Sequence, residues 1–172
     1  VYVQTLRRLS DDLREADLGL SLHDPDHADI DCQAIAQGKI QLLAPHGWLQ
    51  PKQKYISLQD LAGQSMVGLD GHDPLSLALE HKLHALRPAP VIHTRVQTHQ
   101  MMRSMVEAGE GLALVDPFTA LGARTAELDT CPLAPAVPIS LYALSLKNAE
   151  PSPAAQALLE IITEQAVAML AN

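Results

Sequence analysis

The chain has 172 residues, of which 47% are hydrophobic, so it is long enough for one domain or two small lobes around an aliphatic core. Its 12 Lys and Arg residues against 20 Asp and Glu residues give a formal net charge of −8, which excludes a nucleic-acid interface made of clustered basic residues. If the protein acts on DNA, another part of the polypeptide must touch it. No apolar run approaches the roughly 18 residues of a membrane span, and no secretion signal is visible.

The first part of the chain predicts four strands and two helices. Strands are expected at 1–4, 18–22, 30–36 and 39–44, the last two separated by Gln37-Gly38. A helix capped by Thr5 carries apolar residues at helical spacing, namely Leu6, Leu9, Leu13 and Ala16. Ser57 caps a short helix at 58–61 that ends before Gly63.

The rest of the chain alternates strands and helices. Strands are expected at 66–69, 90–96, 112–115 and 139–146. The helices between and after them each begin at a residue suited to cap a helix, in order Asp73, Thr98, Asp116 and Ser152. This order favours an α/β fold with largely parallel sheets covered by helices.

Few residues in the sequence suggest catalysis or a metal site. His81 and His84 have the spacing of a two-ligand pair on one helix, but no third ligand follows at a suitable distance, so exposed helix histidines are the simpler interpretation. Cys32 and Cys131 form no paired motif, and a reducing cytoplasm is the simplest compartment. No nucleophile stands at recognisable spacing from a base, so an enzyme is not expected. No cofactor is implied.

The loops that follow the strands are the better candidates for a binding site, because ligands of α/β sheets bind beyond the carboxyl ends of strands. Four such loops occur, at 21–24, 70–73, 97–99 and 116–118. The Thr98 hydroxyl and the amides that open its helix could hold a carboxylate, and Asp70 or Asp116 could hold an ammonium group. Thr98 and Asp116 could equally serve only as helix caps.

The stretch 96–121 carries a helix ending in the pattern V-x-A-G-x-G, a buried strand and a Pro, here Val106, Ala108, Gly109, Gly111 and Pro117. With this stretch the chain resembles the effector-binding (substrate-binding) domain of LysR-type transcriptional regulators. Other segments resemble that family in the same order, at 13–20, 39–45, 57–63 and 152–159. Thr98-His99 and the segment 116–121 are most similar to the regulators that sense amino acids and opines, including the regulator of lysine biosynthesis that responds to diaminopimelate.

The resemblance implies two Rossmann-like lobes like those of a type II periplasmic binding protein, joined by crossovers that we place near Ser65 and Pro138. Lobe one would comprise 1–64 with 139–172, and lobe two 65–138. The family's domain starts with a strand and a helix before the segment similar to Val1, so we expect an N-terminally truncated piece. An effector would bind between the lobes, at pocket residues carried over by motif position: Ser21, His23, Asp70, Thr98, His99 and Asp116.

The function implied by the resemblance is that of a cytoplasmic ligand-sensing domain of a transcription factor. An amino-acid-like or carboxylate effector would shift the geometry of a homo-oligomer, and DNA would be bound only through a separate N-terminal winged helix-turn-helix, with no part for a membrane. A solute-binding protein of a transport system would share the two-lobed shape and stays an alternative. A packing or oligomerisation piece that binds no ligand is a further one.

Overall fold

The structure is a computed structural model that describes residues 13, 16–70, 74–123 and 127–171. The expected strand at 1–4, the Thr5 cap and the Asp73 cap lie outside the described residues. The chain divides into two compact units: unit 1 comprises Val1–Gln37 and Ile139–Asn172, and unit 2 comprises Gly38–Pro138.

The division of the chain differs from the expected lobes at one of its two crossovers. The chain passes from one unit to the other at Gln37–Gly38 and again at Pro138–Ile139, whereas the sequence pattern placed the first crossover near Ser65. The reason is the pairing of strand β3 (Gln41–Pro45), which lies between β6 (Ala113–Val115) and β7 (Leu128–Pro132). These hydrogen bonds hold residues that were assigned to lobe one within unit 2.

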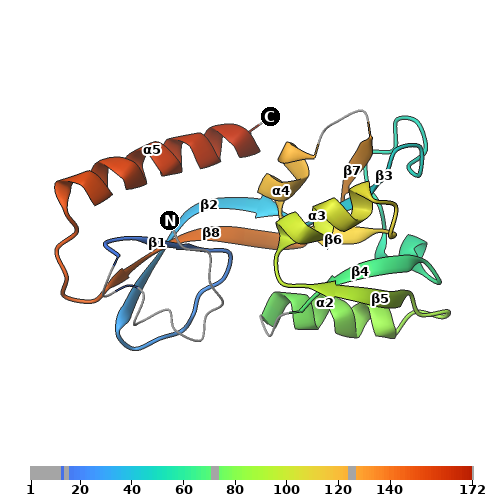
Figure 1. Ribbon diagram of the computed structural model, residues 1–172, viewed down its shortest axis with the longest axis horizontal. Coiled ribbons are helices and arrows are strands. Elements are labelled where there is room, and N and C mark those ends of the chain that lie inside the picture. The colour runs from blue at the N-terminus through green and yellow to red at the C-terminus, as the bar shows by residue number, and fades with distance from the viewer. Residues whose placement is uncertain (1–12, 14–15, 71–73, 124–126, 172) are drawn as a thin grey trace. The chain divides into compact units, whose positions relative to one another are not determined.

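Unit 1 contains a three-stranded sheet and a long helix. The strands are β1 (Gly19–Ser21), β8 (Pro138–Leu146) and β2 (Ile30–Lys39), in the order β1-β8-β2, and β1 pairs antiparallel with β8. Helix α5 (Pro153–Leu170) runs alongside this sheet (Figure 1). Its first turn is capped by Ser152, as the sequence predicts, and the buried core includes Leu13, Ile30 and Leu144.

The first sheet of unit 2 is antiparallel. Strand β3 pairs antiparallel with both β6 and β7, and the 3-10 helix η2 (Leu58–Leu61) precedes the remaining strands. Strand β7 follows no pattern recognised in the sequence. Strand β2 also continues through Gln37-Gly38, where two separate strands were expected.

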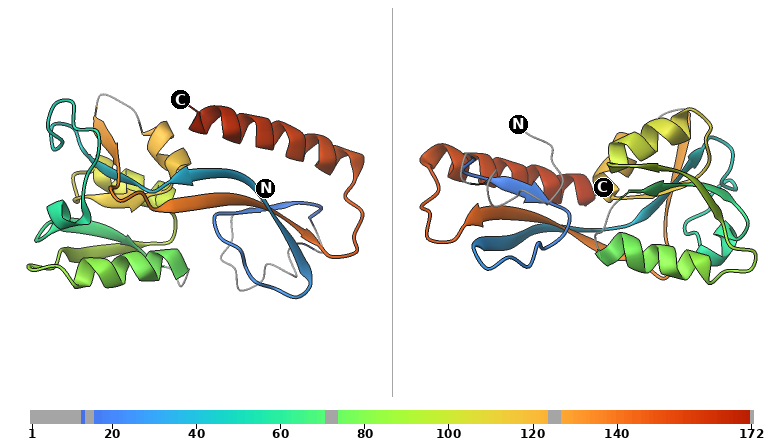
Figure 2. Two further views of the ribbon diagram at one scale, coloured as in Figure 1. Left: turned by 180° about the vertical axis from the view of Figure 1, so that it is seen from behind. Right: turned by 60° about the horizontal axis from the view of Figure 1, so that its bottom comes forward.

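The second sheet of unit 2 has the expected parallel arrangement. Strands β4 (Ser65–Leu69) and β5 (Val91–Val96) pair parallel, and a parallel bridge between Met66 and Leu112 joins β4 to the start of β6. Helices α2 (Pro74–His84) and α3 (His99–Glu107) lie on opposite faces of β4 and β5 (Figure 2). The expectation of largely parallel sheets therefore holds for this part of the fold, whereas the β1–β8 and β3 pairings are antiparallel.

The core of unit 2 gathers where α3 and α4 (Pro117–Gly122) pack on the strands. It contains Leu43, Val67, Val96, Met102, Val106, Ala113, Val115, Ala120, Ala123 and Leu128. Of the three methionines of α3, Met102 is buried, Met105 packs partly against this core and Met101 is 45% exposed. The methionines of α3 thus serve mainly as core residues.

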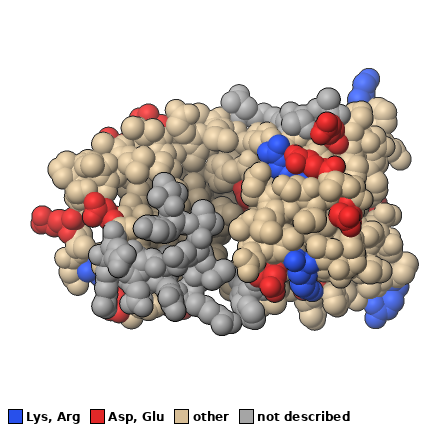
Figure 3. Space-filling model, viewed as in Figure 1, with Lys and Arg blue, Asp and Glu red and all other residues tan. Residues whose placement is uncertain are grey.

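The surface of the described residues has no large basic patch on the face shown in Figure 3, where Lys and Arg side chains lie scattered among acidic ones. Two of the arginines are paired within unit 2, Arg95 with Glu80 and Arg103 with Glu107. In the described part of the chain, no helix is both long and apolar enough to cross a membrane. Cys32 and Cys131 are free thiols.

Candidate functional site

Three of the predicted loops meet at one edge of unit 2. Strands β4, β5 and the start of β6 run parallel, so their carboxyl ends point the same way. Asp70 follows β4, Thr98 follows β5 and Asp116 follows β6. The Asp70 amide donates a hydrogen bond to the carbonyl oxygen of Val96 at 2.6 Å, which joins the first two loops directly.

Thr98 begins helix α3 as its N-cap. Its backbone is extended, and its hydroxyl oxygen accepts a hydrogen bond from the Met101 amide at 3.1 Å. The first intrahelical bond comes from the Met102 amide to the Thr98 carbonyl oxygen, at 3.1 Å. The amides of His99 and Gln100 precede that bond and have no acceptor among the described residues, so they and the Thr98 hydroxyl proton are available to an anion.

Asp116 begins helix α4 in the same manner, with Pro117 in the first turn. Its Oδ1 accepts hydrogen bonds from the amides of Phe118 at 2.8 Å and Thr119 at 3.0 Å. Its Oδ2 accepts one from the Thr119 hydroxyl at 2.6 Å. The prediction that Asp116 caps a helix is therefore confirmed.

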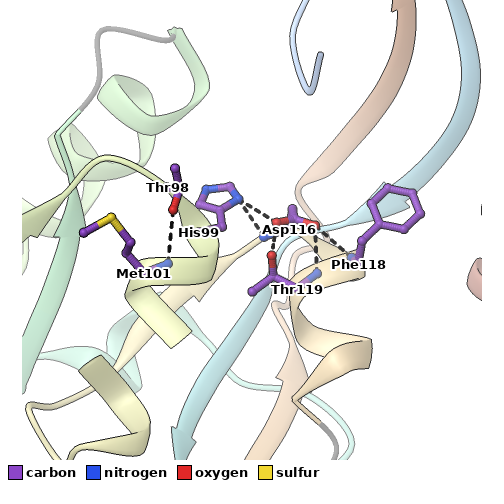
Figure 4. A network of polar contacts seen from close by, with 6 residues as sticks. All are labelled: Thr98, His99, Met101, Asp116, Phe118 and Thr119. Atoms are coloured by element: carbon purple, nitrogen blue, oxygen red, sulfur yellow. Dashed lines mark hydrogen bonds and ion pairs between the residues drawn. The ribbon is translucent and has the colours of Figure 1, made fainter. Parts of the chain in front are cut away.

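Asp116 also contacts a residue of the neighbouring helix start. Nδ1 of His99 lies 2.7 Å from Oδ2 of Asp116, and the two side chains are only 14% and 5% exposed (Figure 4). With this contact, four donors surround the carboxylate, which is about as many as two carboxylate oxygens accept. An ammonium group of an effector would have to displace one of them, so this geometry argues against the direct role expected for Asp116.

The charge of Asp116 follows from these contacts. Burial by itself raises the pKa of the Asp116 carboxyl group, but the hydrogen bond and charge of His99 and the hydrogen bonds from Thr119 outweigh it, and the pKa ends below its ordinary value. Asp116 is thus an anion at neutral pH. An anionic oxygen at 2.7 Å requires a proton on the facing nitrogen, so Nδ1 of His99 is the donor.

Asp70 is exposed and lies at the same edge, beside a cation of its own chain. The carboxylates of Glu80 and Asp70 both raise the pKa of the Arg95 guanidinium, the hydrogen bond from Arg95 to Glu80 being the larger cause. Arg95 donates two hydrogen bonds to Glu80, one of them at 3.1 Å from Nη2 to Oε2. A cationic group near Asp70 would therefore meet the positive field of Arg95.

Ser21 and His23 belong to unit 1, where they form a local turn. The Ser21 hydroxyl donates a hydrogen bond to the His23 carbonyl oxygen at 2.7 Å, and the His23 amide lies 3.2 Å from the same hydroxyl oxygen. Nε2 of His23 is buried and has no partner among the described residues. The structure thus brings Ser21 and His23 into contact with each other, and brings His99 into contact with Asp116.

The other candidates from the sequence do not build a site. His81 and His84 are exposed on α2, and no group of three or more His, Cys, Asp or Glu side chains among residues 13, 16–70, 74–123 and 127–171 is arranged to hold a metal ion. Gly109 and Gly111 both have positive φ and turn the chain between α3 and β6.

The contact between His99 and Asp116 was not foreseen as a contact, although both residues were candidates. The only signal available in the sequence was their position at the ends of two strands that a parallel sheet would bring to one edge.

Comparisons with known proteins agree with this fold. The family profile described as the LysR substrate binding domain matches residues 1–167. A comparison with curated protein sequences finds no match. The regulatory domain of CcmR from Synechocystis PCC6803, solved in complex with 2-PG, is similar with a TM-score of 0.72 and 14% identity, over 92% of this chain and 76% of that one.

Two further solved structures have the same fold. HinK, a LysR family transcriptional regulator from Pseudomonas aeruginosa, gives a TM-score of 0.74 and 21% identity over 98% of this chain and 60% of that one. The effector binding domain of QuiR in complex with shikimate gives a TM-score of 0.67 and 18% identity, over 94% of this chain and 78% of that one.

The chain spans 58% of another regulator from P. aeruginosa, so it corresponds to only part of some of these proteins. At these identities the solved structures establish the fold, an α/β fold of the type II periplasmic-binding-protein kind. The family profile, which covers nearly the whole chain, shows that the chain belongs to the LysR substrate-binding domain family.

Proposed function

We propose that this domain senses a small carboxylate effector, amino-acid-like in character, for a LysR-type transcription regulator. The observation that carries the proposal is the group of donors at the start of α3. The Thr98 hydroxyl and the amides of His99 and Gln100 lie next to the buried pair of His99 and Asp116. Backbone amides at a helix N-terminus, with its positive dipole, favour an anionic group such as a carboxylate.

Several finer parts of the proposal rest on the family resemblance alone. These are the assignment to the amino-acid and opine sensors, the binding of the effector between two lobes with Ser21, His23 and Asp70, and the shift in oligomer geometry. The family resemblance is also the only basis for three further expectations. These are the strand and helix before Val1, DNA binding through a separate N-terminal domain, and a location in the cytoplasm. Two solved relatives, one in complex with 2-PG and one in complex with shikimate, support small anionic molecules as the class to test.

A ligand panel tests the proposal directly. It contains amino acids, diaminopimelate, opines, 2-PG, shikimate and simple dicarboxylates, each added to the folded domain while its thermal unfolding is followed. A ligand present at 100 times its dissociation constant adds about 2.7 kcal/mol, which moves the midpoint by roughly 5–10 °C for a domain of this size. At least one carboxylate is expected to give such a shift.

Variants locate the binding. For any compound that binds, Thr98→Ala should weaken affinity by about tenfold, because it removes one donor to the carboxylate and loosens the cap. His84→Asn, at an exposed position of α2 away from this edge, should leave affinity unchanged. Binding that both substitutions leave intact would place the effector elsewhere, and a panel without any hit would count against the sensor itself.

A further inference from the structure

We propose that the Ser65 hydroxyl is a nucleophile that accepts acyl groups from activated acyl compounds such as aryl esters, with His93 as its base and Glu110 as the residue that orients the imidazole. The inference is independent of effector sensing. Ser65 lies at the amino end of the parallel strands, where β4 begins, whereas Thr98 and Asp116 follow the carboxyl ends of β5 and β6.

The first step is the position of His93, which a β-bulge places beside Ser65. The register between β4 and β5 shifts after Met66, which pairs with Ile92, so that His93 is an extra residue without a partner on β4. An extra residue of this kind re-aims its side chain relative to the regular strand. Nδ1 of His93 lies 3.0 Å from the Ser65 hydroxyl oxygen as a result.

The second step is the carboxylate on the other side of the imidazole ring. Glu110 lies between Gly109 and Gly111, in the turn that leads into β6. Its amide donates a hydrogen bond to the Met105 carbonyl oxygen at 3.0 Å, and its Oε2 lies 3.5 Å from Nε2 of His93. Side chains from β4, β5 and the start of β6 thus form one row of a hydroxyl, an imidazole and a carboxylate.

The third step is the place of the protons in this row. A carboxylate beside Nε2 favours the ring form with its proton on Nε2, because a bare nitrogen there would set a lone pair against the anion. In the neutral ring Nδ1 is then the acceptor, and the Ser65 hydroxyl donates to it. Serine hydrolases activate their nucleophile with the same three groups, although there the two ring nitrogens have exchanged places.

This arrangement supports a single acyl transfer to Ser65. The Ser65 oxygen forms a bond to the acyl carbon of the ester while its proton passes to Nδ1 of His93. The bond between the acyl carbon and the phenol oxygen breaks, and the phenolate leaves with the electron pair. His93 then releases its proton to water, and the product is an ester of Ser65.

The exposure of these side chains limits the chemistry to that transfer. Ser65 is exposed, and the side chains of His93 and Glu110 are 32% and 52% exposed, so a reagent can reach the hydroxyl and water reaches the whole row. Hydrogen bonds stabilise a charged transition state most where water is excluded. We therefore expect a modification site with slow turnover, and not the rates of an enzyme.

Acetylation by p-nitrophenyl acetate measures the reactivity of Ser65. The folded chain is treated at pH 8, above the ordinary pKa of an imidazole of about 6.5, and peptide mass spectrometry follows the acetyl group on each serine. Ser104 is the internal control, because its hydroxyl is exposed on α3 and donates to the Gln100 carbonyl oxygen at 3.4 Å instead of to an imidazole. Ser65 should be acetylated at least about tenfold faster than Ser104, less than the roughly hundredfold or more that a positioned base contributes in enzymes.

Variants separate the roles of the base and of the residue that orients it. His93→Gln keeps a polar side chain but cannot take the proton, so the rate at Ser65 should fall to within about threefold of the rate at Ser104. His84→Gln, at an exposed position of α2, should leave the rate at Ser65 unchanged. Glu110→Gln should lower that rate by about threefold, because the ring keeps its base and loses only the group that orients it. Urea unfolding midpoints equal to that of the wild type show that a change in rate is not a loss of structure.

Two results would overturn the inference. If Ser65 is acetylated no faster than Ser104, or at a rate that His93→Gln leaves unchanged, the row of three side chains is only a structural contact. If the acetyl group accumulates on His93 while Ser65 stays free, the imidazole itself is the nucleophile. Neither result bears on the proposed sensing of an effector, which the ligand panel tests separately.

Discussion

His99 and Asp116 are 17 positions apart in the chain, and Nδ1 of the first lies 2.7 Å from Oδ2 of the second. The contact joins the first residue of α3 to the N-cap of α4. A single buried carboxylate thereby holds two helix starts in place: it caps one and orients the leading side chain of the other.

Asp116→Ala should therefore destabilise the domain more than an ordinary cap substitution. It removes the cap of α4 and leaves the imidazole Nδ1 proton and the Thr119 hydroxyl without their acceptor, and we expect a loss of about 3 kcal/mol in the free energy of unfolding. Urea unfolding measures the loss. Asp70→Ala at the same edge is the control, because Asp70 is exposed and its removal should cost less than about 0.5 kcal/mol. Equal effects of the two substitutions would show that Asp116 does not hold the two helix starts in place.

The contribution of Asp116 should depend on pH in one direction. The pKa of its carboxyl group is lowered in the folded domain, where the hydrogen bonds from His99 and Thr119 outweigh the raising effect of burial. A lowered pKa stabilises the fold above the unfolded value of about 3.9, and this stabilisation is lost as the pH falls through the folded value.

The measurement is urea unfolding of the wild-type domain and of Asp116→Asn between pH 3 and pH 7. The difference in unfolding free energy between the two proteins should be constant above about pH 5 and shrink below about pH 4. A difference that grows in acid would mean that the carboxyl group is protonated in the folded state.

The sequence predicted helix starts well because a cap is a local device. Ser57, Thr98, Asp116 and Ser152 each accept a hydrogen bond from an amide two or three residues further on, within the reach of a sequence pattern. The partner of Asp116 on α3 depends instead on which strands are neighbours, which no local pattern contains.

The strands were harder to predict for the same reason. Strand β7 has a Cys, an Asp and a Thr in its middle and no clear alternation, and it exists because β3 offers it an edge. The Gly38 position looked like a turn, but the backbone there continues as a strand from one unit to the other. Pairing of distant segments decided both cases, and with them the boundary between the two units.

Thr98→Ala should cost about 1 kcal/mol of stability, because the amide of Met101 loses its acceptor. Thr163→Ala is the matched substitution. The Thr163 hydroxyl donates to the Leu159 carbonyl oxygen inside α5, a bond that brings little because that oxygen lies within a helix. Alanine is the better helix former, so Thr163→Ala should be neutral or slightly stabilising. Thermal unfolding compares the two, and a larger loss for Thr163→Ala would contradict this reasoning.

Cys32 should react slowly with alkylating reagents. Burial, followed by the charge and hydrogen bond of Asp24, raises the pKa of its thiol to about 11, and burial also raises the pKa of Cys131. At pH 8 the thiolate fraction of Cys32 is then roughly a hundredfold below that of a free cysteine, and iodoacetamide labelling should be slower in proportion. Asp24→Asn should speed labelling of Cys32 and leave Cys131 unchanged. Labelling at the rate of free cysteine would contradict the expectation.

Two glycines in the turn between α3 and β6 allow the cost of a steric clash to be compared with the cost of backbone strain alone. Gly109 has a φ of +82° with no heavy atom within 4 Å of an added Cβ, so Gly109→Ala should cost only about 1–2 kcal/mol for the left-handed backbone. Gly111 has a φ of +129°, and a Cβ there would lie 2.5 Å from the carbonyl oxygen of Ser65. That oxygen accepts a hydrogen bond from the Leu112 amide at 3.0 Å, so the bridge between β4 and β6 would have to open.

Gly111→Ala should therefore cost more than about 3 kcal/mol or prevent folding of unit 2. Fluorescence of Trp48, which is the chain's single tryptophan and belongs to unit 2, follows urea unfolding of both variants. If a variant does not fold, Trp48 has the emission spectrum of the unfolded chain already in the absence of urea, so the comparison stays informative. Equal unfolding midpoints for the two substitutions would mean that β6 lies further from β4 than the 2.5 Å between an added Gly111 Cβ and the Ser65 oxygen implies. The edge of the sheet that carries Thr98 and Asp116 would then also be less closely packed.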